Sequence, residues 1–324
     1  TILKEEPGNV LGLLGVGESY LHKGDMDRAL YWYVQSIEKA GGILHKEDNS
    51  QELPPLPIDT KDQDLEQLRL MNSKIAIPDA WNGVALTLIM KRKFETALVA
   101  IDRAISLSQK LPLRKQLSFR DKRMTILLYL DRYNEVLEEC AYIDEHDENY
   151  LFISSTMFHK AHAQFYLAEI PGALRTAQDY LEVVGWLEGE AENPDRENLF
   201  ADPKSIHDML LLTGVGHLHE CFHDSDFSKL VDGAGLREAW PFNGVLNLSE
   251  KEMKQHYSLP CEVSEDDLKR LKEISKSFSP PISESFQKSV KFTLSALSMY
   301  PMADGANALL SCLLSLTKSK STNL

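Results

Sequence analysis

Cysteine is scarce in this sequence, and its spacing forms no pattern. The 324 residues include only Cys140, Cys221, Cys261 and Cys312, and no two of them have C-x-x-C spacing. A chain of this size with scattered cysteines does not have the composition of a disulfide framework. We therefore expect reduced core cysteines and a cytoplasmic protein.

Long hydrophobic runs are also missing. The longest apolar stretch near the C-terminus, residues 306–316, contains Asn307 and Ser311 and is too short to span a bilayer. The N-terminal residues do not have the layout of a signal peptide. The sequence therefore predicts no membrane insertion.

Positive charge is the third deficit. Lysine and arginine total 35 against 49 aspartates and glutamates, which gives a net charge of −14. A nucleic-acid backbone or an anionic membrane would require a basic surface, so neither is expected as the main partner. An acidic surface is compatible with a basic partner, and it also simply keeps proteins soluble.

One spacing pattern recurs along the chain. Residues 10–36 have the pattern of two short helices separated by the turn Lys23-Gly24-Asp25, in which Asp25 is placed to cap the second helix. With Val10 as position 1, further copies begin near Pro78, Leu117, Ser154 and, faintly, Leu211. The residues at positions 8, 17 and 20 of the five copies are, in order, Gly17, Met26, Ala29; Ala85, Phe94, Ala97; Met124, Tyr133, Val136; Ala161, Ile170, Ala173; and Leu218, Phe227, Leu230.

Small residues at positions 8 and 20, with an apolar residue at 17, resemble the tetratricopeptide repeat, a helix–turn–helix unit of 34 residues. The resemblance covers roughly the first two thirds of the chain and weakens toward its end. It implies an all-α fold, an α-solenoid of stacked helix–turn–helix hairpins with a C-terminal helical cap.

The composition divides the chain into four parts. We predict a tetratricopeptide-like array over 1–184, an acidic loop over 185–205, a degenerate fifth hairpin and helical cap over 206–317, and a disordered tail over 318–324. Within the array, residues 43–77 are expected to form an inserted loop followed by a separate accessory helix over 64–75. Pro54-Pro55-Leu56-Pro57 in that loop is a candidate polyproline ligand, although such a patch is more often only a stiff loop.

The resemblance also implies a binding groove lined by the first helix of each hairpin. Positions 2, 5, 9, 12 and 13 of the repeats would face it, and the partner would be a protein or peptide with an apolar or basic segment. The candidate groove residues are Leu14, Glu18, Asn82, Leu86, Met90, Asp121, Thr125, Tyr129, Phe158, His162, Phe165 and Tyr166. The alternative is that the chain's own loop or C-terminal helices cover some of them.

Chaperone-binding members of the family hold a terminal carboxylate with lysine and asparagine at positions 5 and 9. Here the first hairpin has Leu14 and Glu18, and the third has Asp121 and Thr125, so only Asn82 is of the right type. A carboxylate would meet acidic groups, so binding of a chaperone tail is not expected.

A single catalytic pattern is present, H-E-x-x-H at residues 219–223. On one helix His219 and His223 could bind Zn²⁺, with Glu220 as the general base of a metallopeptidase. However, Asp224 and Ser225 follow, no further motif supplies a third ligand, and the two histidines also fall at groove positions of the fifth hairpin.

The preferred hypothesis is a non-enzymatic scaffold without metal or cofactor that binds a partner protein in its concave groove. A zinc metallopeptidase is the alternative, and a structural subunit of a larger complex is a further one. The sequence does not identify the partner.

Overall fold

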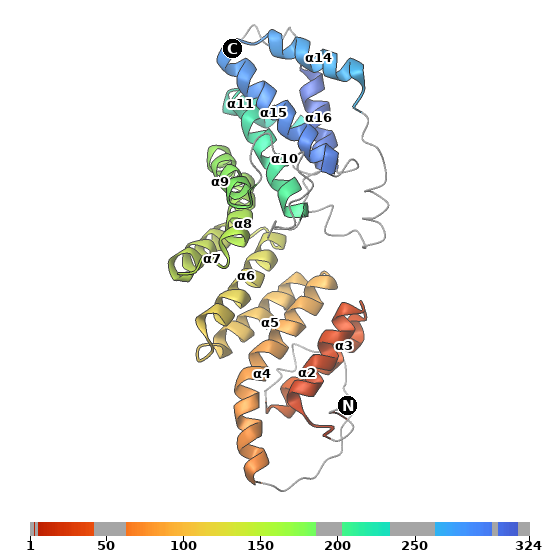
Figure 1. Ribbon diagram of the computed structural model, residues 1–324, viewed down its shortest axis with the longest axis vertical. Helices are drawn as coiled ribbons and strands as arrows, with labels where there is room; N and C mark the ends of the chain where they lie inside the picture. The colour runs from red at the N-terminus through yellow and green to blue at the C-terminus, as the bar shows by residue number, and fades with distance from the viewer. Residues whose placement is uncertain are drawn as a thin grey trace. The chain divides into compact units, whose positions relative to one another are not determined.

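The computed structural model describes residues 3, 6–41, 63–185, 203–233, 263–299 and 304–316, and these residues form α-helices and turns without any strand. The helices follow one another along the chain as in Figure 1. Their bounds are α2 Val10–His22, α3 Met26–Lys39, α4 Gln63–Met90, α5 Phe94–Leu107, α6 Leu113–Tyr129, α7 Tyr133–His146, α8 Ile153–Tyr166, α9 Ile170–Val183, α10 Pro203–His219, α11 Asp224–Gly233, α14 Glu265–Lys276, α15 Pro280–Met299 and α16 Asp304–Ser315.

The chain divides into two compact units, residues 1–156 and 157–324, and the division falls within α8. The fourth predicted hairpin is therefore grouped with the C-terminal helices rather than with the first three hairpins. The polyproline patch, most of the acidic segment 185–205 and the tail 318–324 lie outside the described residues.

The predicted hairpins are present, and local capping explains where their helices begin. The Asn9 side chain accepts a hydrogen bond from the Gly12 amide at 2.9 Å, which caps α2. The Asp25 carboxylate accepts one from the Arg28 amide at 3.1 Å, which caps α3 as expected. Within the first unit, α3 packs on α4, α5 on α6, and α2 on α4, so neighbouring hairpins stack on one another.

The same backbone conformation recurs at position 15 of the first four hairpins. Gly24, Arg92, Asp131 and Ala168 have φ of 76°, 58°, 57° and 62°. Only the first of these is glycine, although residues with a Cβ disfavour this left-handed region. In the fifth hairpin position 15 is Ser225, which lies inside α11, so this turn is built differently.

The first two hairpins are held together around one tyrosine. Tyr33 of α3 is 1% exposed. A Cβ added to Gly17 of α2 would come within 2.9 Å of its ring, and a Cβ added to Gly83 of α4 within 2.4 Å. Burial, together with Glu18 nearby, raises the pKa of Tyr33 to about 12. The two glycines thus let both helices approach the ring closely.

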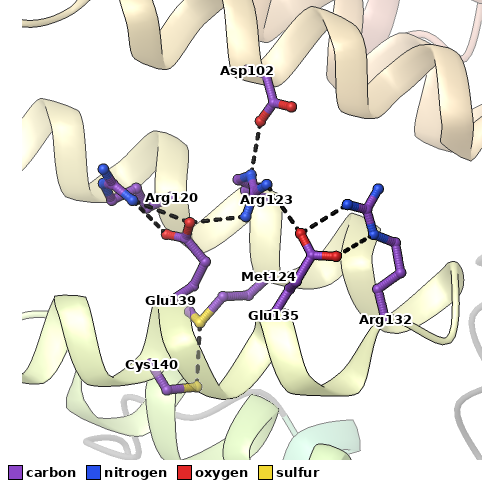
Figure 2. Close-up of polar contacts among 8 residues, drawn as sticks. All are labelled: Asp102, Arg120, Arg123, Met124, Arg132, Glu135, Glu139 and Cys140. Atoms are coloured by element: carbon purple, nitrogen blue, oxygen red, sulfur yellow. Dashed lines mark hydrogen bonds and ion pairs between the residues drawn. The ribbon is translucent and has the colours of Figure 1, made fainter.

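The third hairpin replaces small residues with an ionic clamp. Met124 and Val136 are fully buried at positions 8 and 20. Beside them Glu139 of α7 pairs with Arg120 at 2.8 Å and with Arg123 at 2.9 Å, both on α6. Figure 2 shows that this network continues to α5, where Arg123 pairs with Asp102 at 2.7 Å. Charge-assisted hydrogen bonds therefore hold these helices where close backbone contact is not possible.

Helix α4 corrects one prediction. We expected a break between an accessory helix at 64–75 and the second hairpin from Pro78, but one helix of 28 residues runs through Pro78. Proline lacks an N–H group and normally interrupts a helix at this point. Here Pro78 is itself buried, as are Ala80 and Trp81 after it on the packed side of the helix.

In the second unit α10 is the central helix. Every residue from Ile206 to Leu218 is buried, as expected for a helix that is covered on all sides. Helix α9 packs on it, and so does α15. Helix α15 in turn packs on α14 and α16, so the C-terminal helices cover the apolar surface of α10.

Candidate protein-binding face

An accessible and largely apolar part of the predicted groove lies on α4. One side of this helix, with Trp81, Val84 and Ala85, is buried in the hairpin. Other positions of α4 stay partly or fully accessible, and these recur at intervals of three or four, so they form one helical face. We call this surface the α4 face; it consists of Asp79, Asn82, Leu86, Ile89 and Met90.

The α4 face is apolar in its C-terminal half. Met90 is 63% exposed, and Leu86 and Ile89 are half-buried beside it. At the other end Asp79 is paired with Lys115 of α6 at 2.6 Å. The side-chain oxygen of Asn82 accepts no hydrogen bond from any described residue. That oxygen is buried, so the accessible apolar stripe alone is the surface suited to a partner's side chains.

Ion pairs fix this helix between its neighbours. The Lys91 ammonium, directly after α4, lies 2.6 Å from the Asp27 carboxylate at the start of α3. That contact lowers the pKa of Asp27, chiefly through the hydrogen bond from Lys91. Together with the Asp79–Lys115 pair, it links α4 to both adjoining hairpins, so the face is preformed.

The candidates on α2 and α6 are less accessible than expected. Glu18 is exposed, but Leu14 is buried in the core. Asp121 is also buried, where it accepts hydrogen bonds from Lys122 and Ser155. Leu14 and Asp121 therefore do not line an open groove, because the neighbouring hairpin packs on them.

Thr125 and Tyr129 of α6 are half-buried. The Tyr129 ring stacks on Phe94 of α5, with 4.3 Å between centroids. One face of the ring is thus used within the molecule, and Tyr129 can contribute to a surface only through its remaining atoms.

In the second unit the prediction fails for two of four residues. Phe158 and Tyr166 are half-buried, whereas Phe165 is 4% exposed and His162 is completely buried. His162 Nε2 lies 3.9 Å from an Asp208 carboxylate oxygen of α10, and burial lowers the pKa of His162. The chain's own helix α10 covers this position, which is the alternative that the sequence left open.

The H-E-x-x-H pattern does not lie on one helix. Helix α10 ends at His219, a turn follows, and α11 begins at Asp224. His219 Nε2 contacts the Asp224 carboxylate at 2.9 Å, while His223 is exposed in the turn. The spacing of one helical turn that the zinc motif requires is therefore not formed.

The other two polar groups of the motif also have structural contacts. Burial opposes ionisation of Glu220, but hydrogen bonds with His217 at 2.9 Å and from Ser285 at 2.8 Å keep the pKa of Glu220 below its ordinary value. Burial, with Glu220 nearby, raises the pKa of Cys221 to about 12. In the described part of the chain no three histidine, cysteine or acidic side chains converge as a metal site.

Sequence reasoning found the α4 face but not its limits. It could not tell which positions the next hairpin covers, because that depends on how helices far apart in the chain pack.

Among the helices described above, none is both long and apolar enough to cross a bilayer. Comparisons of the chain with protein-family models, with curated proteins and with solved structures find no match.

Proposed function

We propose that this protein is a non-enzymatic, tetratricopeptide-like scaffold that binds a segment of a partner protein on the α4 face. The observation that carries the proposal is the accessible apolar stripe of Leu86, Ile89 and Met90 on a helix whose opposite side is fully packed. Apolar side chains grouped on one accessible helical face can serve as anchoring sites for a partner segment.

The chemistry of the face indicates the kind of segment. Apolar side chains of the partner would cover Leu86 and Met90. The turn after α4 adds Arg92 and Lys93, both exposed. An amphipathic helix or an extended peptide with apolar anchors meets these requirements.

A preformed face favours binding because less conformational entropy is lost when the partner docks. Packing on α3 and α5 holds α4 in place, and the Asp79–Lys115 and Lys91–Asp27 pairs, each at 2.6 Å, add links at its surface. Methionine is flexible and polarisable, so Met90 can adapt to side chains of different shape.

The test is affinity purification from the cells that make this protein, with mass spectrometry of the retained partners. The variant Leu86→Glu/Met90→Glu places two charges on the α4 face, and we expect it to lose the partner at least tenfold. The matched control is Val99→Glu/Leu107→Glu, which charges two exposed apolar residues of α5 in the same unit.

Partners that are retained equally by both variants would contradict the assignment of the α4 face. Loss in the control alone would move the binding surface to α5. Circular dichroism of both variants checks that each stays helical.

A further inference from the structure

A groove of about 330 Å³ lies between α14 and α15 in the second unit. Its floor is apolar, formed by Leu271, Phe286 and Val290. Its rim carries Leu268, which is 43% exposed, and the exposed lysines Lys272 and Lys276. We call it the α14–α15 groove.

Local hydrogen bonds preform the α14–α15 groove. The Ser275 and Ser283 hydroxyls lie 2.9 Å apart, and the Gln287 amide donates to Ser275 at 2.9 Å, which ties α14 to α15. At the start of α14 the Ser264 hydroxyl caps the helix by accepting from the Asp267 amide at 3.1 Å. Phe278 packs on Phe286 with 5.3 Å between ring centroids and supports the floor from behind.

The charge of the groove is opposite to that of the chain. The described residues that line it include two lysines and no carboxylate, although the whole protein has a net charge of −14. Lys272 and Lys276 are one helical turn apart and so lie on the same side of α14. Among the described residues neither has a carboxylate within ion-pairing distance, whereas Lys269 pairs with Asp266 and Lys288 with Glu284 on the same two helices.

We propose that the α14–α15 groove binds a short segment of a partner protein in which large apolar side chains are flanked by aspartate or glutamate. The apolar side chains would cover Leu268 and enter the groove above Phe286. The acidic groups would approach Lys272 and Lys276, which supply charge complementarity and orientation.

The open shape of the groove favours a peptide over an enclosed small molecule. Small-molecule pockets of about 300–1,000 Å³ bury most of the ligand surface. The volume of about 330 Å³ falls within this range, but the described lining comes from two helices only, with an exposed leucine at the rim. Such a groove accepts side chains that project from a backbone lying outside it.

This groove lies in a different unit from the α4 face, and the two proposals are independent. A peptide whose binding depends on Leu86 and Met90 would support the α4 face and not the α14–α15 groove. A result that contradicts one site leaves the evidence for the other unchanged.

The test is a selection of phage-displayed 16-residue peptides against the full chain, followed by fluorescence anisotropy with the synthetic peptides obtained. We expect enriched peptides to combine leucine, phenylalanine or tryptophan with flanking aspartate or glutamate. Lys272→Glu/Lys276→Glu should weaken their binding at least tenfold. The matched control, Lys269→Glu/Lys288→Glu, reverses the same number of charges on the same helices outside the lining and should leave affinity within about twofold.

A second measurement separates charge from apolar contact. Replacing the acidic residues of a selected peptide with asparagine and glutamine should also weaken binding at least tenfold, and Leu268→Ala should weaken it severalfold. The proposal is overturned if the selection yields no peptide sensitive to the Lys272/Lys276 reversal, or if the sensitive peptides are not acidic.

Discussion

Two glycines determine how closely the first helices approach Tyr33. This ring fills the space between α2, α3 and α4, and neither Gly17 nor Gly83 has room for a methyl group beside it. Small residues in the repeat pattern thus act through a specific aromatic partner. At the turn positions, by contrast, the backbone imposes a left-handed conformation on residues that do not favour it.

Gly83→Ala should destabilise the protein, because the new Cβ would lie 2.4 Å from a Tyr33 ring carbon. Overpacking of this kind costs about 1–3 kcal/mol. Gly15→Ala is the matched control on α2, where no atom lies within 4 Å of the added Cβ. It should stabilise the helix by about 0.5–1 kcal/mol. Urea denaturation measures both, and equal effects of the two changes would contradict this account.

Ala168→Gly should stabilise the protein, because Ala168 has φ of 62°. Relief of the left-handed strain is worth about 1–2 kcal/mol, and the added flexibility of glycine in the unfolded chain removes about 0.5–1 kcal/mol of that. The net gain in the free energy of unfolding is therefore about 0–1.5 kcal/mol. Ala161→Gly, at a buried helical position, serves as the control and should be destabilising.

At the scale of elements, hairpins of the same pattern use different means to hold their helices together. The first two rely on small residues and the third on the clamp around Glu139 (Figure 2). In the second unit, α8 and α10 place His162 opposite Asp208 away from water. Each of these contacts should change the free energy of unfolding in its own way when one of its residues is replaced or protonated.

Glu139→Gln should destabilise the third hairpin, because it leaves Arg120 and Arg123 without their shared carboxylate. Both arginines are partly exposed, so solvent screening limits the loss to about 1–3 kcal/mol. Glu284→Gln removes an exposed pair with Lys288 and should cost only about 0.3–0.5 kcal/mol. Chemical denaturation measures the free energy of unfolding of both variants. Equal losses in the two would contradict the clamp.

Acid should destabilise the second unit through His162. Burial holds the folded-state pKa of His162 below its usual 6.5. Below pH 6.5 the unfolded chain therefore binds a proton that the folded chain excludes. The free energy of unfolding should fall by at most about 1.4 kcal/mol per pH unit between 6.5 and the folded-state pKa, and this contribution is absent above that range. Urea titrations at pH 7.5 and 5.5 should show a smaller pH effect in His162→Gln. Identical pH effects would exclude His162 as the cause.

At the scale of the whole molecule, the helices pack mainly on near neighbours in the sequence within two compact units. Structures of this kind transmit a local change only to adjoining elements. The main contact between helices more distant in the sequence is that of α10 with α15, inside the second unit.

Hydrogen exchange should reveal this locality. Gly83→Ala is expected to speed amide exchange in α2 to α5, while α14 to α16 retain their protection, because the altered contact with Tyr33 lies in the first unit. Mass-spectrometric exchange of the wild type and the variant provides the comparison. A uniform loss of protection in both units would instead indicate one cooperative structure.

Several features of this protein follow from sequence because they are local. The spacing of small and apolar residues predicted the hairpins, and Asp25 was correctly identified as a helix cap. The Ser264 cap of α14 is of the same local kind, since capping depends only on residues three or four apart. The apolar face of α4 follows from the same helical periodicity.

Tertiary packing decided what local patterns could not. It buried Leu14, Asp121, His162 and Phe165 at positions where the repeat pattern predicts a groove. It carried α4 through Pro78 and ended α10 inside the H-E-x-x-H pattern. The physical reason is that a helix is specified by its own residues, whereas the exposure of its side chains depends on which distant helices cover it.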